Sequence, residues 1–340
     1  MRHSPQHLGF APDLDARLET ARGAREVSNL HGVVVLRGRL ALERYSTGDD
    51  DAWGRPLGRI AFNAETLHDV RSVTKSVVGL LYGIALERGS VPDPEDKLFA
   101  SFPQFPDLAA DPDRNGLTIG HVLTMTMGLE WDEARPYTDP ANSEIAMEAA
   151  PDRCRFILER PVVAEPGRHW LYTGGATALL GWLISQGTGS SLSEFAHDAL
   201  FSPLGITTFE WARGRDGTPA AASGLRLRPR DLARIGHLVL QNGVCDERAI
   251  VPSSWLDVAV GEHVEIDGDH WYGYHWYSGR THEAVPDQRW IGAFGNGGQQ
   301  LWIFPGLDLV IACAFGNYDQ PDQRGAPENL LRTILGALES

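Results

Sequence analysis

Strand-like segments lie near both ends of this 340-residue chain, and the segments between them mostly have the patterns of helices. Near the N-terminus, residues 31–36 and 40–45 are aliphatic-rich and are joined by Arg37-Gly38-Arg39, a connection short enough for a β-hairpin. Near the C-terminus, four further strands are expected at residues 271–277, 290–294, 299–304 and 309–315. Strands from both ends fit most simply into one antiparallel sheet that is flanked by helices.

The predicted fold class is therefore α/β, in the α+β sense, with a mainly helical domain inserted into a sheet domain. We place the discontinuous sheet domain at residues 1–89 and 216–340 and the helical domain at residues 90–215, with the active site between them. The polar, Gly-rich segment 46–66 is expected to be a loop.

Helices are expected where apolar residues recur with helical spacing and capping residues stand at the ends. Residues 72–88 are apolar on nearly all sides, so this helix should be buried. Thr118 is a candidate N-cap, and Ser191 with Glu194 has the spacing of a capping box. Further helices are expected at residues 13–30, near 143–150 in an otherwise irregular stretch, and at 174–188, 191–200, 229–240 and 327–338.

The charge balance argues against nucleic acid and membrane surfaces as partners. The chain has 30 Lys and Arg against 45 Asp and Glu, a formal net charge of −15, and no Lys/Arg-rich run. Its three widely spaced cysteines form neither a disulfide framework nor a zinc pattern. The start lacks the apolar core of a signal peptide, and the longest apolar stretch, near residues 77–86, is too short to span a bilayer. We expect a cytoplasmic protein that needs no metal or cofactor.

Lysine is nearly absent: the chain has only Lys75 and Lys97, and its other 28 basic residues are arginines. Lys97 lies among acidic residues in an expected loop. Lys75 lies in the expected buried helix, where one chemical property separates it from arginine. A desolvated amine can lose its proton at accessible pH, and a guanidinium cannot.

Ser72 and Lys75 are three positions apart at the start of this helix, so their side chains share one face. The positive end of the helix dipole lies at Ser72, where an oxyanion can be stabilised. Apolar neighbours are expected to desolvate the amine, lower its pKa and make it a base. The alternative is a structural pair, in which Ser72 caps the helix and Lys75 extends to the solvent. Spacing alone leaves both open.

With this Ser-x-x-Lys motif, the chain resembles the serine β-lactamase and penicillin-binding-protein superfamily. The resemblance extends over about residues 30–335 and is nearest to the class C-like branch of family VIII esterases and 6-aminohexanoate-dimer hydrolases. It rests on an ordered set of segments: residues 62–89, 117–129, Glu165-Pro166-Gly167, Tyr172-Thr173-Gly174, 201–206, 224–233, and Gly295-Asn296-Gly297-Gly298-Gln299 with 302–305.

The resemblance implies that Ser72 is the nucleophile, that Lys75 takes its proton, and that Tyr172 relays the proton to the leaving group. A cation such as Lys75 would lower the pKa of the Tyr172 phenol. Without the family match, the residues favour a core aromatic role for Tyr172, whose hydroxyl merely finds a hydrogen-bond partner.

Two departures from the family pattern bear on the substrate. The family often has Tyr-x-Asn, whereas Gly174 stands at the third position here. No lysine follows Lys97, so the usual Lys-Thr-Gly motif, which helps to hold the substrate carboxylate, is absent. Its place falls near Asn296, Gly297, Gly298 and Gln299, where a backbone N–H is expected to complete an oxyanion hole with that of Ser72. The alternative for these glycines is a tight hairpin turn.

The predicted function is a serine hydrolase that acts through an acyl-enzyme on a small ester or amide. Trp131, Tyr137 and the strand at 271–277 could line its acyl pocket or simply pack as aromatic side chains. Two alternatives remain: a degenerate family member that binds a ligand or partner, and a true β-lactamase or D-peptidase. The sequence leaves the oligomeric state open.

Overall fold

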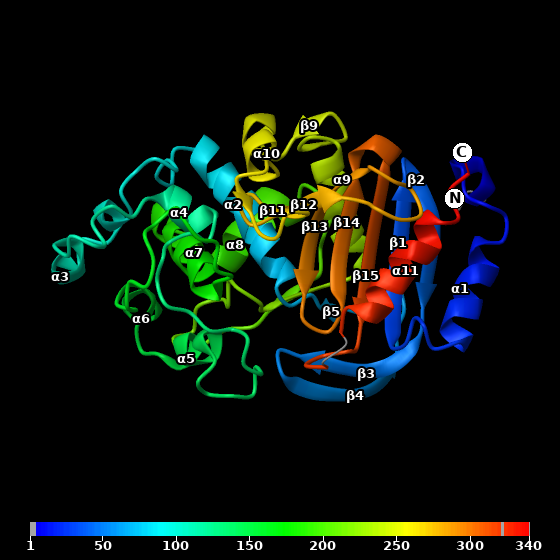
Figure 1. Ribbon diagram of the computed structural model, residues 1–340, viewed down its shortest axis with the longest axis horizontal. Helices are drawn as coiled ribbons and strands as arrows, with labels where there is room; N and C mark the ends of the chain where they lie inside the picture. The colour runs from blue at the N-terminus through cyan, green and yellow to red at the C-terminus, as the bar shows by residue number, and fades with distance from the viewer. Residues whose placement is uncertain (1–4, 321–322, 340) are drawn as a thin grey trace.

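The computed structural model describes residues 5–320 and 323–339, and its largest element is an eight-stranded antiparallel sheet (Figure 1). The strand order is β10-β11-β12-β13-β14-β15-β1-β2, so a strand from the C-terminal part pairs with the first strand of the chain. The strands are β1 (Leu30–Arg37), β2 (Arg39–Tyr45), β10 (Val264–Glu265), β11 (His270–Tyr272), β12 (Tyr277–Arg280), β13 (Arg289–Gly295), β14 (Gln299–Phe304) and β15 (Leu309–Phe315). The predicted antiparallel sheet built from both ends of the chain is confirmed.

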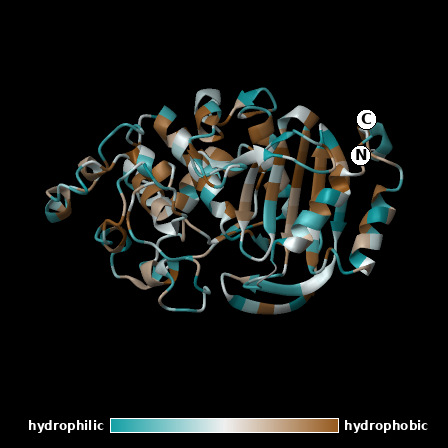
Figure 2. Cartoon of the chain, in the orientation of Figure 1, coloured by the Kyte–Doolittle hydropathy of each residue, from teal (hydrophilic) through white to brown (hydrophobic). Residues whose placement is uncertain are grey.

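Alternate residues of the central strands enter two different hydrophobic cores. Val33 and Val35 of β1 pack in one core with α1 (Leu14–Gly23) and α11 (Gly325–Leu335), and Val34 packs in the other. Helix α9 (Pro229–Leu240) lies on this second face, against β1, β14 and β15. Both faces are therefore covered, which explains the nearly continuous apolar runs of these strands (Figure 2).

The other helices gather mainly at the end of the molecule away from β2 (Figure 1). They are α2 (Val73–Glu87), α3 (Pro106–Ala109), α4 (Ile119–Leu123), α5 (Ser143–Ala149), α6 (Arg153–Leu158), α7 (Gly174–Thr188), α8 (Leu192–Ala196) and α10 (Ser253–Ala259). One hydrophobic core runs from these helices to the sheet. The domain boundaries at residues 89 and 215 stay a prediction.

Helix α2 forms the middle of this core, as its apolar sequence predicts. All of its residues from Val73 to Ala85 are buried. A Cβ added at Gly83 would lie 2.1 Å from the Trp255 ring, so this glycine permits close packing against α10. Within the described ranges, no helix is long and apolar enough to cross a membrane.

Several local predictions are confirmed in detail. Helix α7 has the predicted bounds, and the side chains of Thr118 and Ser191 accept the capping hydrogen bonds at the starts of α4 and α8. The expected strand at 271–277 is interrupted between β11 and β12, where His275 takes a φ of +65°. Helix α6 was not anticipated in the stretch expected to be mostly irregular.

The predicted loop at 46–66 is wrong: it holds the hairpin β3 (Thr47–Ala52) and β4 (Arg55–Ala61). β3 contains Gly48 and three consecutive aspartates, and most of β4 is exposed, so neither strand has the apolar alternation of a half-buried strand. Two short ladders complete the structure: β5 (His68–Asp69) with β7 (Leu225–Leu227) and β6 (Glu210–Trp211), and β8 (Val244–Cys245) with β9 (Arg248–Ala249).

Two buried histidines beside this hairpin predict a loss of stability in acid. Nδ1 of His31 lies 2.8 Å from Nε2 of His68, and burial lowers the pKa of His31 to about 4 and that of His68 well below its usual value. Because the unfolded chain then binds more protons than the folded one, this stability is present above pH 6.5 and is lost as the pH falls towards 4. For His31 the loss is about 3 kcal/mol.

Urea unfolding of wild type and His31→Gln between pH 7.5 and 4 measures this effect. The variant should show a shallower decrease in the free energy of unfolding, whereas the exposed control His263→Gln should follow wild type. Parallel curves for wild type and His31→Gln would contradict the assignment.

Candidate active site

Ser72 stands at the N-terminal end of α2, in the N-cap position, but its hydroxyl makes no capping hydrogen bond. Instead, Nζ of Lys75 donates a hydrogen bond to Oγ of Ser72 over 3.1 Å. The structural reading of Ser72 as a helix cap is therefore ruled out. The two side chains meet on one helix face, as their spacing predicts.

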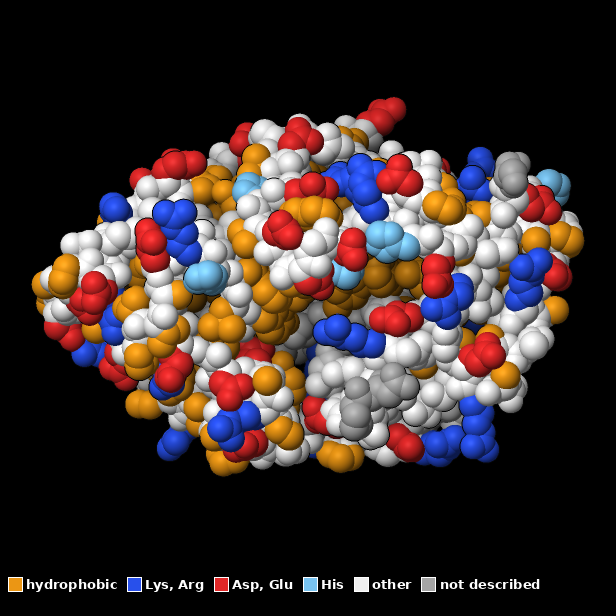
Figure 3. All heavy atoms as spheres, viewed as in Figure 1, with side chains coloured by type: hydrophobic (Ala, Val, Ile, Leu, Met, Phe, Trp, Pro, Cys, Tyr) orange, Lys and Arg blue, Asp and Glu red, His pale blue; other side chains and the backbone are white. Residues whose placement is uncertain are grey.

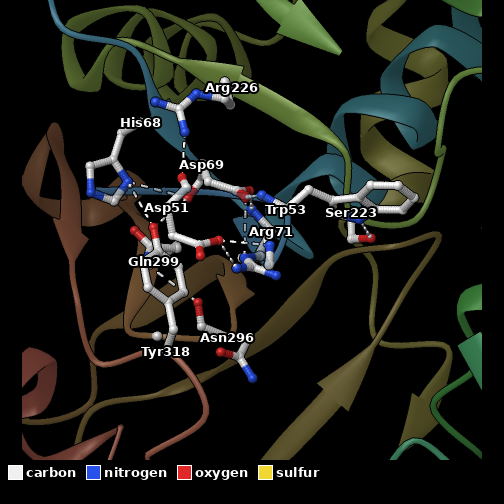
Figure 4. Close-up of polar contacts among 12 residues, drawn as sticks. Asp51, Trp53, His68, Asp69, Arg71, Ser223, Arg226, Asn296, Gln299 and Tyr318 are labelled. Carbon is white, nitrogen blue, oxygen red and sulfur yellow. Dashed lines mark hydrogen bonds and ion pairs between the residues drawn. The ribbon is translucent and has the colours of Figure 1, made fainter. Parts of the chain in front are cut away.

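The residue before Ser72 has a strained backbone that an aspartate holds in place. Arg71 has a φ of +48°, and its backbone N–H donates to Oδ1 of Asp69 over 3.0 Å. Oδ2 of Asp69 accepts the backbone N–H of Trp53 over 2.6 Å (Figure 4). Asp69 is 1% exposed, so this buried anchor joins the start of α2 to the β3–β4 hairpin.

Lys75 is buried, with 2% of its surface exposed, so it does not extend to the solvent. Its ammonium group has three donors and faces three acceptors. These are Oγ of Ser72, the carbonyl oxygen of Ala222 at 2.9 Å and Oε2 of Glu144 at 3.5 Å. These contacts, together with a hydrogen bond to Tyr172, suit a protonated amine.

The expectation that burial would lower the pKa of Lys75 is wrong in its net result. Burial does lower it, but the negative charges of Glu144 and Glu133 and the nearby Tyr172 outweigh burial and raise it. Lys75 is an ammonium in the resting site. The apolar neighbours were visible in the sequence, whereas the carboxylates come from distant segments.

Tyr172 lies just before α7 and covers the amine of Lys75, with Nζ 4.8 Å from its ring centroid. Burial raises the pKa of the Tyr172 phenol, while Lys75 and a hydrogen bond with Ser72 lower it, and burial prevails. The expected effect of the cation is present but smaller than desolvation. The structure thus brings together Ser72, Lys75 and Tyr172.

Gly174, at the position where the family often has asparagine, leaves space for two carboxylates. A Cβ there would lie 2.7 Å from Oε2 of Glu144 and 2.8 Å from Oε1 of Glu133. Oε1 of Glu133 also accepts the backbone N–H of Gly174 over 2.5 Å and the indole N–H of Trp131 over 2.6 Å. Burial, followed by the charge of Glu144, raises the pKa of Glu133 to about 7.

The turn at Asn296–Gln299 does not offer its glycine N–H groups to Ser72. The N–H of Gly297 donates to the side chain of Gln323, and that of Gly298 to the carbonyl of Gly295. The side chains of Asn296 and Gln299 bind Asp319 and the backbone of Phe315. The backbone N–H groups of Gly297 and Gly298 are therefore engaged elsewhere, and the oxyanion role of this turn stays a prediction.

The segment that does approach Ser72 is the end of β13. A Cβ at Gly295 would lie 3.1 Å from the backbone nitrogen of Ser72 and 2.5 Å from the carbonyl oxygen of Val70. Absence of a side chain there permits the strand to pack directly against the start of α2. Gly295 lies one residue before the turn for which an oxyanion role was predicted.

Aromatic side chains extend from Tyr172 towards the sheet. Trp170 contacts Tyr172, Tyr272 and Tyr277, with ring centroids 5.4 to 6.2 Å apart. Figure 3 shows a hollow between the helical end and the sheet with hydrophobic side chains on its walls. Trp131 and Tyr137 both bind Glu133, so they shape the acidic side of the site.

Sequence reasoning missed Glu144, Glu133, Ser223 and Trp53. One signal was available: a lysine in a buried helix needs an anionic partner. The sequence does not say which of 45 acidic residues provides it. In the part of the chain that the structure describes, no three His, Cys, Asp or Glu side chains gather as a metal site requires.

Comparison with known proteins gives consistent matches. The beta-lactamase family matches residues 15–335. The chain is 24% identical over 376 aligned positions to 6-aminohexanoate-dimer hydrolase of Paenarthrobacter ureafaciens, covering 97% of this chain and 82% of that one. Lovastatin esterase of Penicillium rubens is 26% identical over 146 residues, 39% of this chain and 33% of the esterase. The solved structure of EstCE1, a hydrolase with promiscuous acyltransferase activity, has a TM-score of 0.78 at 16% identity and covers 95% of this chain and 99% of that one.

The match over nearly the whole length defines the class: the chain belongs to the beta-lactamase family. The family resemblance predicted from the motifs is confirmed. Within this family the protein is an enzyme, a serine hydrolase with relatives among amide and ester hydrolases.

Proposed function

We propose that this hydrolase cleaves small esters or amides through an acyl-enzyme on Ser72. The observation that supports it most is the 3.1 Å contact between Oγ of Ser72 and Nζ of Lys75, at the N-terminal end of a buried helix and beneath Tyr172. A hydroxyl beside a proton-transferring group and a helix dipole is the arrangement that nucleophilic catalysis needs.

In this mechanism, Oγ of Ser72 attacks the substrate carbonyl carbon and its proton enters the Lys75–Tyr172 pair. Because Lys75 is held as an ammonium, it accepts this proton only as it passes one of its own to a neighbouring acceptor, and it takes that proton back when the leaving group departs. Tyr172 delivers a proton to the leaving group as the carbon–oxygen or carbon–nitrogen bond breaks. Water then attacks the acyl group and the same groups work in reverse.

The oxyanion is stabilised by the N–H of Ser72 and the positive end of α2. We place the second hydrogen-bond donor, a backbone N–H, at the end of β13, since Gly295 packs against the backbone of Ser72. This replaces the turn at Asn296–Gln299, whose glycine N–H groups have other partners.

The two carboxylates near Ser72 favour neutral substrates over anionic ones. Glu133 and Glu144 occupy the space beside Gly174, and the carboxylate of Glu144 faces the ammonium group of Lys75. The relatives named as 6-aminohexanoate-dimer hydrolase and lovastatin esterase support an amide or ester as the substrate. A reducing, cytoplasmic location stays a prediction, supported by three free cysteines.

A substrate panel tests this proposal. We expect kcat/KM for p-nitrophenyl butyrate to exceed that for nitrocefin, which carries a carboxylate, by at least about 100-fold, because like charges repel across a poorly solvated site. A linear amide dimer without a carboxylate near the scissile bond separates amidase from esterase activity. Nitrocefin turnover equal to that of the ester would favour a true β-lactamase.

A further inference from the structure

Glu144 makes two contacts that the proton transfer described above does not yet use. Its Oε2 lies 3.5 Å from Nζ of Lys75, and its Oε1 accepts a hydrogen bond from Oγ of Ser223 over 2.5 Å. Glu144 and Lys75 are each 2% exposed, so the pair is shielded from water. Such a buried carboxylate is held by its partners rather than by solvent.

A hydrogen-bond chain fixes the orientation of this carboxylate. Oγ of Ser223 accepts the indole N–H of Trp53 over 3.0 Å, so its own proton points to Oε1 of Glu144. Oε2 is then left for Lys75. Trp53 lies in the turn of the β3–β4 hairpin, where Asp69 holds its backbone N–H (Figure 4).

We propose that Glu144 is the final acceptor of the Ser72 proton during acylation and that it acts through Lys75, while Ser223 and Trp53 position it. This inference rests on the proposed function of Ser72 as the nucleophile. It goes beyond the motif residues, because Glu144, Ser223 and Trp53 belong to none of the family segments in the sequence.

The proton balance is simple. The Ser72 hydroxyl proton moves to Nζ of Lys75 as an ammonium proton moves from Nζ to Oε2 of Glu144, and the Oγ–carbon bond forms. Lys75 begins and ends as an ammonium, and Glu144 ends as a neutral acid. When the leaving group departs, Tyr172 protonates it and regains its proton from Lys75, which in turn takes back the proton of Glu144. No further reactant is needed.

Other titratable groups surround the pair and enter its pH dependence. They are Glu133 and Tyr137 before α5, Glu148 on α5, Tyr172 before α7 and His275 between β11 and β12. Glu133, whose pKa is about 7, feels the charge of Glu144, so removing that charge moves the Glu133 titration to lower pH. Any shift of the acid limb that arises through Glu133 is therefore downward, opposite to the upward shift expected for loss of the Glu144 carboxylate.

The test is the pH profile of kcat for p-nitrophenyl butyrate in wild type and Glu144→Gln. The amide cannot accept the proton, so at pH 7 kcat should fall by about 10²- to 10⁴-fold. Residual activity then requires the free amine of Lys75, so the acid limb should move up by about 2 pH units or more, since amines titrate above carboxylic acids. An acid limb that stays in place or moves down would overturn the proposal.

Two variants keep this test decisive. Glu144→Asp retains a carboxylate, so it should recover part of kcat with an acid limb at the wild-type position. Glu148→Gln removes a buried carboxylate one turn further along α5, where it pairs with Arg153. It removes a nearby negative charge but leaves the acceptor Glu144 in place, so it should not raise the acid limb. If Glu144→Gln does not fold, a displaced limb in Glu144→Asp overturns the proposal.

Trp53→Phe tests whether the β3–β4 hairpin helps to position Glu144 through Ser223. It keeps an aromatic ring and removes the N–H donor, so kcat should fall about 3- to 10-fold with KM within twofold. An unchanged kcat would overturn the positioning role of Trp53.

Labelling by a fluorophosphonate probe separates this inference from the proposed function. Wild type and Glu144→Asp should both be labelled at Ser72. If Ser72 is labelled but the acid limb of Glu144→Gln does not rise, only the role of Glu144 fails. If no serine is labelled, the proposed nucleophile fails.

Discussion

Replacing Ser72 by alanine is expected to lower kcat/KM for p-nitrophenyl butyrate by at least about 10⁴-fold, because it removes the hydroxyl that forms the proposed acyl-enzyme. The substitution removes one hydroxyl at a position that is 9% exposed and does not cap α2, so the fold should persist. Lys75 keeps its contacts to Ala222 and Glu144.

The measurement is ester hydrolysis with fluorophosphonate labelling in parallel. Thermal unfolding of the variant provides the control for folding. Hydrolysis at the wild-type rate, or labelling of another serine, would show that Ser72 is not the nucleophile.

Replacing Lys75 by arginine is expected to lower kcat by about 10³-fold, within the range that general acid–base groups supply. Arginine keeps the positive charge opposite Glu144 but does not release a proton. The comparison therefore separates proton transfer from charge alone. The larger guanidinium must also fit a site that leaves 2% of Lys75 exposed.

Lys97→Arg is the matched control, since Lys97 is the other lysine of the chain and its side chain is exposed. Its kcat should stay within about twofold of wild type, as is usual for surface substitutions. Near-wild-type turnover by Lys75→Arg would mean that Lys75 contributes its charge and not its proton.

Several parts of the molecule followed directly from the amino-acid sequence. Apolar periodicity predicted α7 with its observed bounds, and the apolar run at 72–88 predicted a buried α2. The three-residue spacing predicted that Lys75 reaches Ser72, because both side chains belong to one helical turn. The order of the motifs along the chain predicted the family, because a motif is recognised from its residue identities alone.

The tertiary structure decided the charge of the site. Glu144 is 69 positions from Lys75, so no local spacing pairs them, and its carboxylate reverses the pKa shift that burial of Lys75 would produce. The β3–β4 hairpin was also beyond local reading, because its polar strands lack apolar alternation and its Trp53 contacts Asp69 and Ser223 through the fold. Local sequence determined helices such as α2 and α7 and the Ser72–Lys75 pair, which depend on neighbours within a few residues. Electrostatics and hydrogen bonding in a buried site depend on which distant segments fold together, and that was decided only in three dimensions.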